Sequence, residues 1–375
     1  MTPPLMDEEW QILASMLPEG WEGLAGPTGA MQRARGEIKS AETLLKLLLL
    51  HIATGLSLKQ TVVRAKLQGI ADISDVALLK RLRSSDRWLR ELSLRMFHDG
   101  RFARSVVMVP SGCHLRAIDA TTIEEPGATG TSWRVHYSLN MSNLACDYYE
   151  LSDARGGESF RRFPVNQGDI ILADRGYCHR EGVAHVVQNG GNVIVRLNST
   201  SFPLLSRENG APFQLLSHLR QLKGSRPKEW DVNFKAGGKM INARLCALRK
   251  GAIATEKAQK RAKKVAKKNT KILRPETLEC AGYVYVLTTI DNRVMTTKQI
   301  LDLYRARWQI ELCFKRMKSL FRLGHLPKRN DDSARAWIQG KLLTVLLIEK
   351  MIDQARFFSP WGYAITSKES MAGIH

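Results

Sequence analysis

The sequence has 375 residues, a formal net charge of +21 and a pI near 9.9, which favour a protein of several domains with a polyanionic partner, most often nucleic acid. Six scattered cysteines without a CxxC pair exclude a disulfide framework and a cysteine zinc site, and they indicate a reducing, cytoplasmic setting. No apolar run approaches the ~18–20 residues that a bilayer requires, and the polar N-terminus is no signal peptide, so no membrane partner is expected.

Residues 1–105 are predicted to form a helical DNA-binding domain. One helix is indicated by an apolar stripe at helical spacing, made by Leu44, Leu45, Leu48, Leu49 and Ile52. Ser57 and Gln60 have the spacing of a capping box, which begins a second helix ending near Leu67. Ser74 begins a third helix, whose basic residues make the pair similar to a helix-turn-helix with a longer connection than usual.

Residues 106–200 change to strand-like patterns, which are rich in β-branched and aromatic residues. Strands are predicted at SVVMV, HLRAID, WRVHYSLN and CDYYELSD, followed by a short buried strand at IILAD. A helix over residues 180–188 and a strand at GNVIVRLN come next. From HLRAID onward the predicted order is three strands, a short connection, a strand, a helix and a strand.

Residues 201–290 break this rhythm and are predicted to form a β-rich insert. Prolines and several short apolar runs precede a lysine-rich block at residues 256–271, in which alanines and a valine share one helical face. A solvated, charged helix is the main interpretation of this block, and contact with DNA phosphates is the alternative. The strand YVYVLTTI closes the insert.

Two further helices are predicted after the insert. Thr296 and Gln299 form a second capping-box pattern, which begins a helix that carries Tyr304 to Lys318 and ends at the following glycine and proline. Residues 331–375 form a C-terminal segment with one amphipathic helix. Its wide apolar side fits either core packing or a subunit contact.

Three acids are candidates for a metal site. Asp119 ends the strand LRAID, Asp174 ends the strand ILAD, and Glu311 lies on the helix after the insert. A carboxylate at the end of a buried strand is costly unless a cation pairs with it, although aspartates also cap turns and helices. Such hard oxygen ligands hold Mg²⁺ or Mn²⁺, and two ions together promote phosphoryl transfer. We expect Asp119 to bridge both ions and, without metal, at least one acid to have a raised pKa.

Other ionisable residues lie near these acids. Asp153 and Glu158 belong to the same region of the chain and compete with the assignment. His114, His136 and His325 are possible bases, but two-metal chemistry needs none, so all three are interpreted as structural.

The helix after the insert carries a narrow polar stripe. Counted from Tyr304 at about 100° per residue, Arg307, Glu311 and Lys318 point to roughly 300°, 340° and 320°. A carboxylate in this stripe can hold a metal ion while the two cations bind phosphate on either side. The alternative interpretation is the solvated face of a charged helix, with an ordinary i,i+4 pair between Arg307 and Glu311.

This region resembles the DDE transposases of bacterial insertion sequences, in the subgroup with a Y-x2-R-x3-E-x6-K signature. The spacings of the signature are satisfied by Tyr304, Arg307, Glu311 and Lys318. The segments AIDATTIEEPG with WRVHYSLNM, and GDIILADRGY, resemble the family's regions around the first and second acids. The similarity runs from about residue 110 to about residue 330, with weaker likeness in the N-terminal helices.

The resemblance implies an α/β fold with a ribonuclease-H-like catalytic core. The core would begin in residues 106–200, be interrupted by the β-rich insert at residues 201–290, and be completed by a catalytic helix in residues 291–330. A helical DNA-binding domain at residues 1–105 and a C-terminal helical segment at residues 331–375 would flank it.

The resemblance also implies an activity, which is metal-dependent cleavage at insertion-sequence ends followed by strand transfer into target DNA. The reaction would be cut-and-paste through a hairpin, with two Mg²⁺ ions for which Mn²⁺ can substitute. The catalytic acids and metal ligands would be Asp119, Asp174 and Glu311. The partners would be the inverted repeats at the element's ends, target DNA and, in the synaptic complex, a second copy of the chain. The enzyme would work at the bacterial nucleoid, in the cytoplasm.

Further residues would contact DNA. Phosphates near the cut would be bound by Tyr304, Arg307 and Lys318. Tyr285, or its neighbour Tyr283, would stack on a flipped base, with burial in a strand as the alternative. Arg175 would meet a phosphate or pair with the adjacent aspartate.

Two other functions fit the same residues. A catalytically idle descendant would act as a sequence-specific DNA-binding repressor, although such a protein gains nothing from carboxylates clustered beside phosphate. A host nuclease or resolvase with the same core would need neither DNA-reading helices nor flanking inverted repeats. The chain ends with WGYAITSKESMAGIH and no clear terminal domain, so the pairing of ends is less strongly expected than the chemistry.

Overall fold

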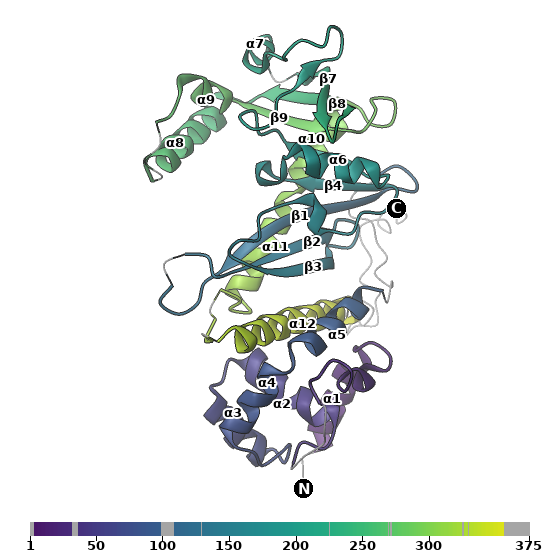
Figure 1. Ribbon diagram of the computed structural model, residues 1–375, viewed down its shortest axis with the longest axis vertical. Coiled ribbons are helices and arrows are strands. Elements are labelled where there is room, and N and C mark those ends of the chain that lie inside the picture. Colours follow the sequence, from purple (N-terminus) through teal and green to yellow (C-terminus); the bar gives the residue numbers. More distant parts are fainter. Residues whose placement is uncertain are drawn as a thin grey trace, which may run out of the picture.

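The N-terminal part of the chain folds into helices, as its apolar spacing predicts (Figure 1). The computed structural model describes every residue except 1–3, 32–36, 99–108, 129, 225, 269, 271, 325, 329 and 356–375. Its N-terminal helices are α1 (Pro4–Ser15), the short 3₁₀ helix η1 (Trp21–Leu24), α2 (Ala41–Thr54), α3 (Leu58–Leu67), α4 (Asp75–Arg83) and α5 (Asp86–His98).

Capping side chains fix where α3 and α4 begin. The Ser57 hydroxyl accepts a hydrogen bond from the Gln60 N–H, and the Gln60 side-chain oxygen accepts one from the Ser57 N–H. Ser74 caps α4, and its hydroxyl accepts a hydrogen bond from the Ala77 N–H. Both predicted starts are confirmed. The two helices pack against each other and are joined by residues 68–74.

The strands predicted in the middle of the chain form one half of a nine-stranded sheet. The strands β1 (His114–Ile123), β2 (Trp133–Asn140) and β3 (Ala145–Asp153) pair antiparallel, and β4 (Asp169–Ala173) and β5 (Asn192–Arg196) continue from β1 in parallel. The helix α6 (Arg180–Gln188) connects β4 to β5. The predicted order from HLRAID onward is confirmed, whereas SVVMV lies outside the described residues except for its last residue.

Residues 201–290 extend the same sheet. The strand β9 (Tyr283–Thr288) pairs antiparallel with β5, and beyond it follow β8 (Lys239–Arg249), β7 (Lys228–Ala236) and β6 (Leu205–Ser206). The strand order is therefore β3-β2-β1-β4-β5-β9-β8-β7-β6. The accompanying helices are α7 (Leu215–Arg220), α8 (Ala252–Lys268) and α9 (Pro275–Cys280). The lysine-rich block is helical, as predicted, and α8 projects to one side of the molecule (Figure 1).

The prediction that one helix carries the signature from Tyr304 to Lys318 is wrong at Arg307. The structure has two helices there, α10 (Thr297–Ala306) and α11 (Trp308–Ser319). The Arg307 N–H bonds to the Tyr304 carbonyl, three residues back, at 3.2 Å, so the chain makes a tighter turn there. Arg307 keeps right-handed helical angles (φ −53°, ψ −28°), and the polar stripe therefore continues across the break.

The last helix among the described residues connects the N-terminal helices to the sheet. The predicted capping box of Thr296 and Gln299 is confirmed at the start of α10. The long helix α12 (Asp331–Ala355) packs against α2, α4 and α5 on one side and touches β3 on the other. It therefore lies between the N-terminal helices and the sheet (Figure 1). No helix among the described residues combines the length and the apolarity needed to cross a bilayer.

Both faces of the sheet are covered. On one face α11 packs against β1, and the rings of Phe314 and Tyr137 meet edge to face with centroids 5.8 Å apart. On the other face α6 shares a buried apolar cluster with Ile118. Because side chains alternate along a strand, Asp119 points to the same face as Ala117, which belongs to the cluster on the α11 side. The fold is thus mixed α/β, and it directs the first candidate acid towards the signature helix.

Candidate active site

The parallel pairing of β1 and β4 brings Asp119 and Asp174 to the same end of this strand pair. The last paired residues are Ala117 and Leu172, after which β4 ends at Ala173 and Asp174 follows. The prediction that Asp119 ends its strand is wrong, because β1 continues to Ile123. The reason is its second neighbour: Asp119 pairs with Tyr137 of β2, and that antiparallel ladder runs past the end of β4.

Asp119 is held by a backbone hydrogen bond and by an ion pair. Its Oδ1 accepts a hydrogen bond of 2.8 Å from the Ala120 N–H, and its Oδ2 lies 3.6 Å from Arg307 Nη1. Burial raises the pKa of Asp119 to about 7, and the negative charges of Asp174 and Glu158 add to this effect. The expectation that one acid has a raised pKa without metal agrees with this environment.

Asp174 is fixed by the backbone that follows it. Its Oδ1 accepts a hydrogen bond of 2.6 Å from the Gly176 N–H and so caps the short 3₁₀ helix η3 (Arg175–Tyr177). The Oδ1 atom of Asp174 is therefore directed towards the turn after β4.

Arg307 separates Glu311 from the other acids. Its guanidinium is half-buried, lies 3.6 Å from Asp119, and donates a short hydrogen bond to the Glu311 carboxylate. Its Cζ also lies 5.9 Å from the centroid of the Tyr304 ring. Glu311 itself is 58% exposed at its side chain, and Lys318 is exposed and has no ion pair or hydrogen bond within the described part of the chain. Three of the four signature residues thus form one contact group.

The acids do not form a closed metal cage. No set of three or more His, Cys, Asp or Glu side chains in the described ranges is arranged to hold a metal ion. The positive charge between Asp119 and Glu311 is supplied instead by Arg307. The two carboxylates that Arg307 neutralises are hard oxygen ligands, the kind that Mg²⁺ and Mn²⁺ prefer.

The structure adds two residues to this group. The carboxylate of Glu158, in the loop after β3, and that of Asp174 both flank Gly176: a Cβ built there would lie 1.7 Å from Glu158 Oε2 and 3.1 Å from Asp174 Oδ1. Tyr177 is buried in the same short helix as Gly176, and burial, followed by the charges of the acids, raises the pKa of its phenol. The sequence placed Glu158 near this region, but no pattern singled out its position or that of Tyr177.

The remaining residues predicted to contact DNA are Arg175 and Tyr285, with Tyr283 as the alternative to Tyr285. Arg175 is exposed and forms no described ion pair with Asp174; its charge instead acts on the phenol of Tyr285. Tyr285 and Tyr283 are only 3% and 7% exposed. Either ring must therefore become accessible before a base can stack on it, and the stacking role stays a prediction.

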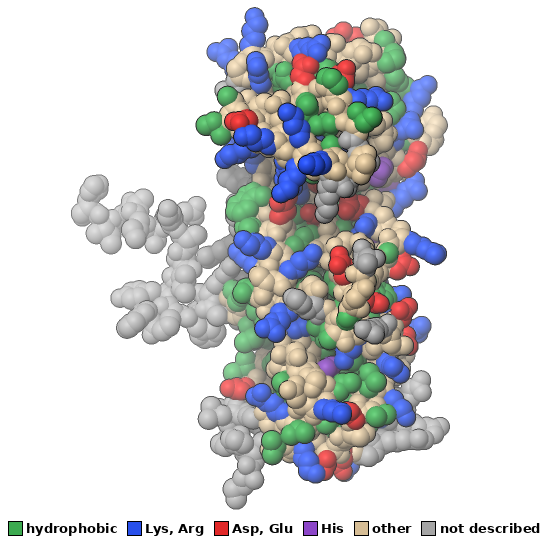
Figure 2. Space-filling view, turned by 90° about the vertical axis from the view of Figure 1, so that its left-hand side faces the viewer, with side chains coloured by type: hydrophobic (Ala, Val, Ile, Leu, Met, Phe, Trp, Pro, Cys, Tyr) green, Lys and Arg blue, Asp and Glu red, His purple; other side chains and the backbone are tan. Residues whose placement is uncertain are grey.

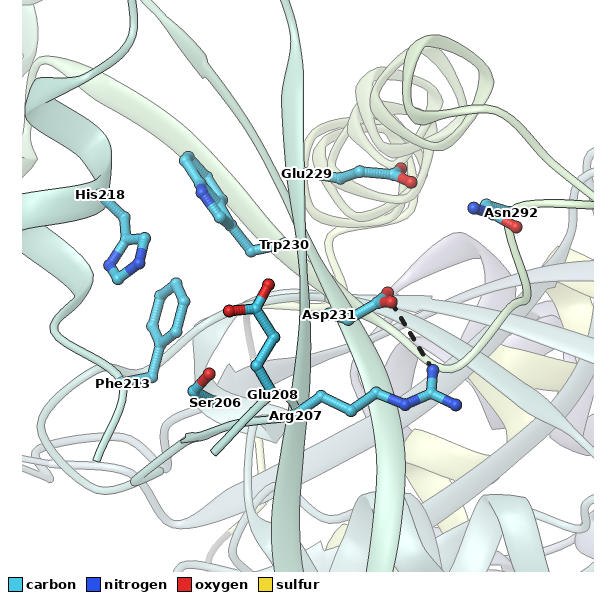
Figure 3. Close-up of a pocket in the computed structure, with 9 residues that line it drawn as sticks. All are labelled: Ser206, Arg207, Glu208, Phe213, His218, Glu229, Trp230, Asp231 and Asn292. Carbon is cyan, nitrogen blue, oxygen red and sulfur yellow. Dashed lines mark ion pairs between the residues drawn. The ribbon is translucent and has the colours of Figure 1, made fainter. Parts of the chain in front are cut away.

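A pocket of about 360 Å³ lies elsewhere, on the part of the sheet formed by residues 201–290 (Figure 3). Phe213 stacks on His218 with ring centroids 4.1 Å apart, and Trp230 contacts both rings edge-on. Arg207 and Asp231 form an ion pair of 3.7 Å at its rim. None of the predicted site residues lines this pocket.

Basic side chains are frequent on one face of the molecule. The face that carries α8 has many Lys and Arg side chains (Figure 2). On α8 the exposed cations are Lys257, Lys260, Arg261, Lys263, Lys264 and Lys267. Such a surface attracts polyanions and repels other basic surfaces.

Comparison with known proteins gives consistent matches. A family model described as a transposase DDE domain matches residues 152–347, a range that includes Asp174 and Glu311. The chain is 33% identical, over 94% of its length and 96% of the relative's, to the putative transposase InsL for insertion sequence element IS186A of Escherichia coli. It is also 33% identical, with the same coverage, to the transposase for insertion sequence element IS421 of Escherichia coli. A transposase for element IS231F of Bacillus thuringiensis is 25% identical over 51% of this chain and 43% of its own length.

Proposed function

Since this chain belongs to the DDE transposases of insertion sequences, we propose that it cuts DNA at the ends of its element in a metal-dependent reaction and joins those ends to target DNA. The observation that carries the proposal is the meeting of Asp119 and Asp174 at the edge of the parallel pair β1/β4, beneath the helix that carries Glu311. Burial and the charge of Asp174 raise the pKa of Asp119, so a bound cation would lower the cost of holding these two half-buried acids together.

In this proposal Asp119, Asp174 and Glu311 hold two divalent ions, Mg²⁺ or Mn²⁺. The ions would supply activation of the attacking water or 3′-hydroxyl and stabilisation of the leaving oxygen. Asp119 would be the central ligand, because it lies between Asp174, which follows the neighbouring strand, and the Arg307–Glu311 pair. Its raised pKa means that its proton must leave when the carboxylate becomes a ligand.

Arg307 has two successive partners in this proposal. Without metal it neutralises Asp119 and Glu311. With divalent ions held by those carboxylates, its guanidinium would be free to bind a phosphate of the DNA near the cut, for which its planar fork is suited. Tyr304, whose ring centroid lies 5.9 Å from the Arg307 Cζ, would help to orient the guanidinium, and exposed Lys318 would add a second phosphate contact further along α11.

The finer features of the reaction follow the family resemblance. We propose a ribonuclease-H-like core in residues 106–200 and 291–330, interrupted by residues 201–290, and end recognition by the helices of residues 1–105. The reaction is cut-and-paste through a hairpin, carried out by a homodimer that pairs the two ends. The packing of α3 on α4 and the basic face around α8 support DNA contact by both parts.

The decisive experiment is cleavage of a plasmid that carries the gene with its native flanks, with Mg²⁺ or with chelator, by wild type and Glu311→Gln. Wild type should cut both flanks only with metal. The variant should lose cleavage while its affinity for the ends stays within about tenfold, because a lost metal ligand chiefly affects chemistry. Equal loss of binding and cleavage would remove Glu311 from the ligand set. Binding without any cutting by wild type would favour the alternative, a catalytically idle repressor.

A further inference from the structure

The helix α8 carries its six exposed cations on one face. Counted from Lys257 at about 100° per residue, the other five point to between roughly 240° and 40°, so all six share an arc of about 160°. Glu256 pairs with Lys260 at 2.6 Å, and the remaining five cations form no ion pair with any described residue. This face therefore offers five uncompensated positive charges to an anion, and those that lie four residues apart, such as Lys257 and Arg261, repel each other.

The opposite face of α8 fixes this orientation. Gln259 Nε2 donates a hydrogen bond of 3.2 Å to the Leu278 carbonyl of α9. Thr255 packs against Gly282, where a Cβ would lie 3.2 Å from Thr255 Cγ2. On the same count Thr255 and Gln259 point to about 160° and 200°, away from the cationic arc. The contacts with α9 and with the start of β9 therefore turn the cations outward.

The sheet places α8 at the end of the strands where Asp174 lies. The strands β4 and β5 run parallel to β1, β9 runs antiparallel to β5, and β8 runs antiparallel to β9. Hence β1, β4, β5 and β8 all run in one direction. Asp174 follows the end of β4, and only residues 250 and 251 separate the end of β8 from the start of α8.

Arginines occupy the strand ends between Asp174 and α8. Arg175 is exposed next to Asp174, Arg196 is half-buried at the end of β5, and Arg249 is exposed at the end of β8. In the strand order β8 lies three positions from β4, or about 14–15 Å at a spacing of ~4.8 Å. The three arginines and the six cations of α8 are called the basic track. They can follow the phosphates of one duplex from α8 towards the acids.

The helix α8 has little means of recognising a base sequence. Five of its six exposed cations are lysines, which bind phosphates as point charges. The helix contains no asparagine, and its one glutamine, Gln259, is turned to α9. The helices α3 and α4, which belong to the part proposed to recognise the element's ends, lie at the opposite end of the molecule (Figure 1). A duplex on α8 is therefore one whose sequence the protein does not need to recognise there.

We propose that α8 binds the target DNA and that the basic track leads this duplex to the acids at the ends of β1 and β4. This inference rests on the proposed function, because it names the surface that holds the second DNA of that reaction. The target is held through its phosphates, while the element's ends are held by the helices of residues 1–105.

The test is a triple variant of the full-length protein, Lys257→Gln with Arg261→Gln and Lys264→Gln, which neutralises the centre of the arc. Its affinity for a plain duplex without the element's flanks should fall at least about tenfold at physiological salt, and the slope of log affinity against log salt should fall by about 2–3. Affinity for the native flanks and metal-dependent cleavage there should stay within about threefold of wild type. Joining of the cut ends to a second plasmid should fall at least about tenfold, in line with the lost duplex affinity.

A matched triple variant controls for net charge. Lys223→Gln with Lys235→Gln and Lys239→Gln removes three exposed lysines from the same part of the chain but outside α8. It should leave the slope and the joining unchanged. Lysine, arginine and glutamine have similar helix propensities, so far-ultraviolet circular dichroism should show the same helix content in both variants and wild type.

The outcomes separate this inference from the proposed function. If the α8 variant binds plain duplex with the affinity and slope of wild type, the role of α8 is overturned and the transposase chemistry stands. If the variant loses flank cleavage as strongly as joining, α8 holds the DNA beside the element's ends, and the target is excluded as its occupant. If wild type binds plain duplex but cuts no flank with any metal, the proposed function falls and the assignment of target DNA falls with it.

Discussion

Arg307 shows which residue contacts a sequence can reveal. Its hydrogen bond to Glu311 follows from helical spacing alone, because residues four apart share a face. Its approach to Asp119 does not, since it depends on α11 lying over β1. The position of Glu158 beside Asp174 could not be predicted from the sequence, because Glu158 lies in a loop without a periodic pattern. The structure shows it, since both carboxylates flank Gly176.

Lys318 gives a prediction that concerns a single residue. It is exposed, it is unpaired in the described part of the chain, and it lies on the stripe of Arg307 and Glu311. Lys318→Ala should weaken binding to DNA ends and lower the slope of log affinity against log salt by about 1, because one phosphate contact releases about one counterion. The measurement is a binding titration at several salt concentrations.

A matched variant controls for charge. Lys298→Ala removes another exposed lysine, from the first turn of α10 and away from the stripe, and should leave the slope unchanged. A slope that is the same for Lys318→Ala and wild type would mean that Lys318 touches no phosphate.

At the level of elements, helix starts were predictable and strand ends were not. The capping boxes at Ser57 and Thr296 are local, so three or four residues determine them. The length of β1 depends on β2, whose pairing with residues beyond Asp119 prolongs the strand. The break between α10 and α11 at Arg307 likewise has no glycine or proline to announce it.

The helix α12 carries an acid that should make stability depend on pH. Glu349 Oε2 accepts a hydrogen bond of 3.4 Å from the Cys146 N–H of β3, and burial raises the pKa of Glu349 from 4.5 to about 7. The folded protein therefore prefers the protonated acid. Its stabilising effect is complete below pH 4.5, the ordinary value, and is lost as the pH rises to about 7.

Glu349→Gln should remove this dependence, because a neutral amide keeps the acceptor oxygen and cannot ionise. Relative to wild type, the variant should gain about 2–3 kcal/mol of unfolding free energy between pH 5 and pH 8, from about 1.4 kcal/mol for each unit of pKa shift. Urea unfolding at both pH values measures it. Glu19→Gln, at an exposed position, should show no such difference, and equal effects of Glu349→Gln at both pH values would contradict the prediction.

For the whole molecule, the sequence predicted the succession of helical, mixed and β-rich parts but not their continuity. Residues 201–290 add their strands to the sheet that begins with β1, through the pairing of β9 with β5. Nothing local encodes this, because strands far apart in sequence meet only after the chain between them has folded. The same is true of α12, whose apolar side fitted either core or subunit contact and which packs within the chain against α2 and α5.

The contact between α12 and α2 should make the N-terminal helices and the sheet unfold together. Gly340 of α12 faces Ile52 of α2, and a Cβ at Gly340 would lie 2.4 Å from Ile52 Cδ1, which is itself in a fully buried side chain. Gly340→Ala should therefore destabilise the whole protein by about 1–2 kcal/mol, since overpacking costs more than the gain in helix propensity. Ile52→Val removes Cδ1 and should restore most of this loss in the double variant, although alone it costs about 0.5–1.5 kcal/mol.

Urea unfolding followed by far-ultraviolet circular dichroism and by tryptophan fluorescence should give one coincident transition for all four proteins. Two separate transitions, with only the first shifted by Gly340→Ala, would mean that the N-terminal helices fold independently of the sheet.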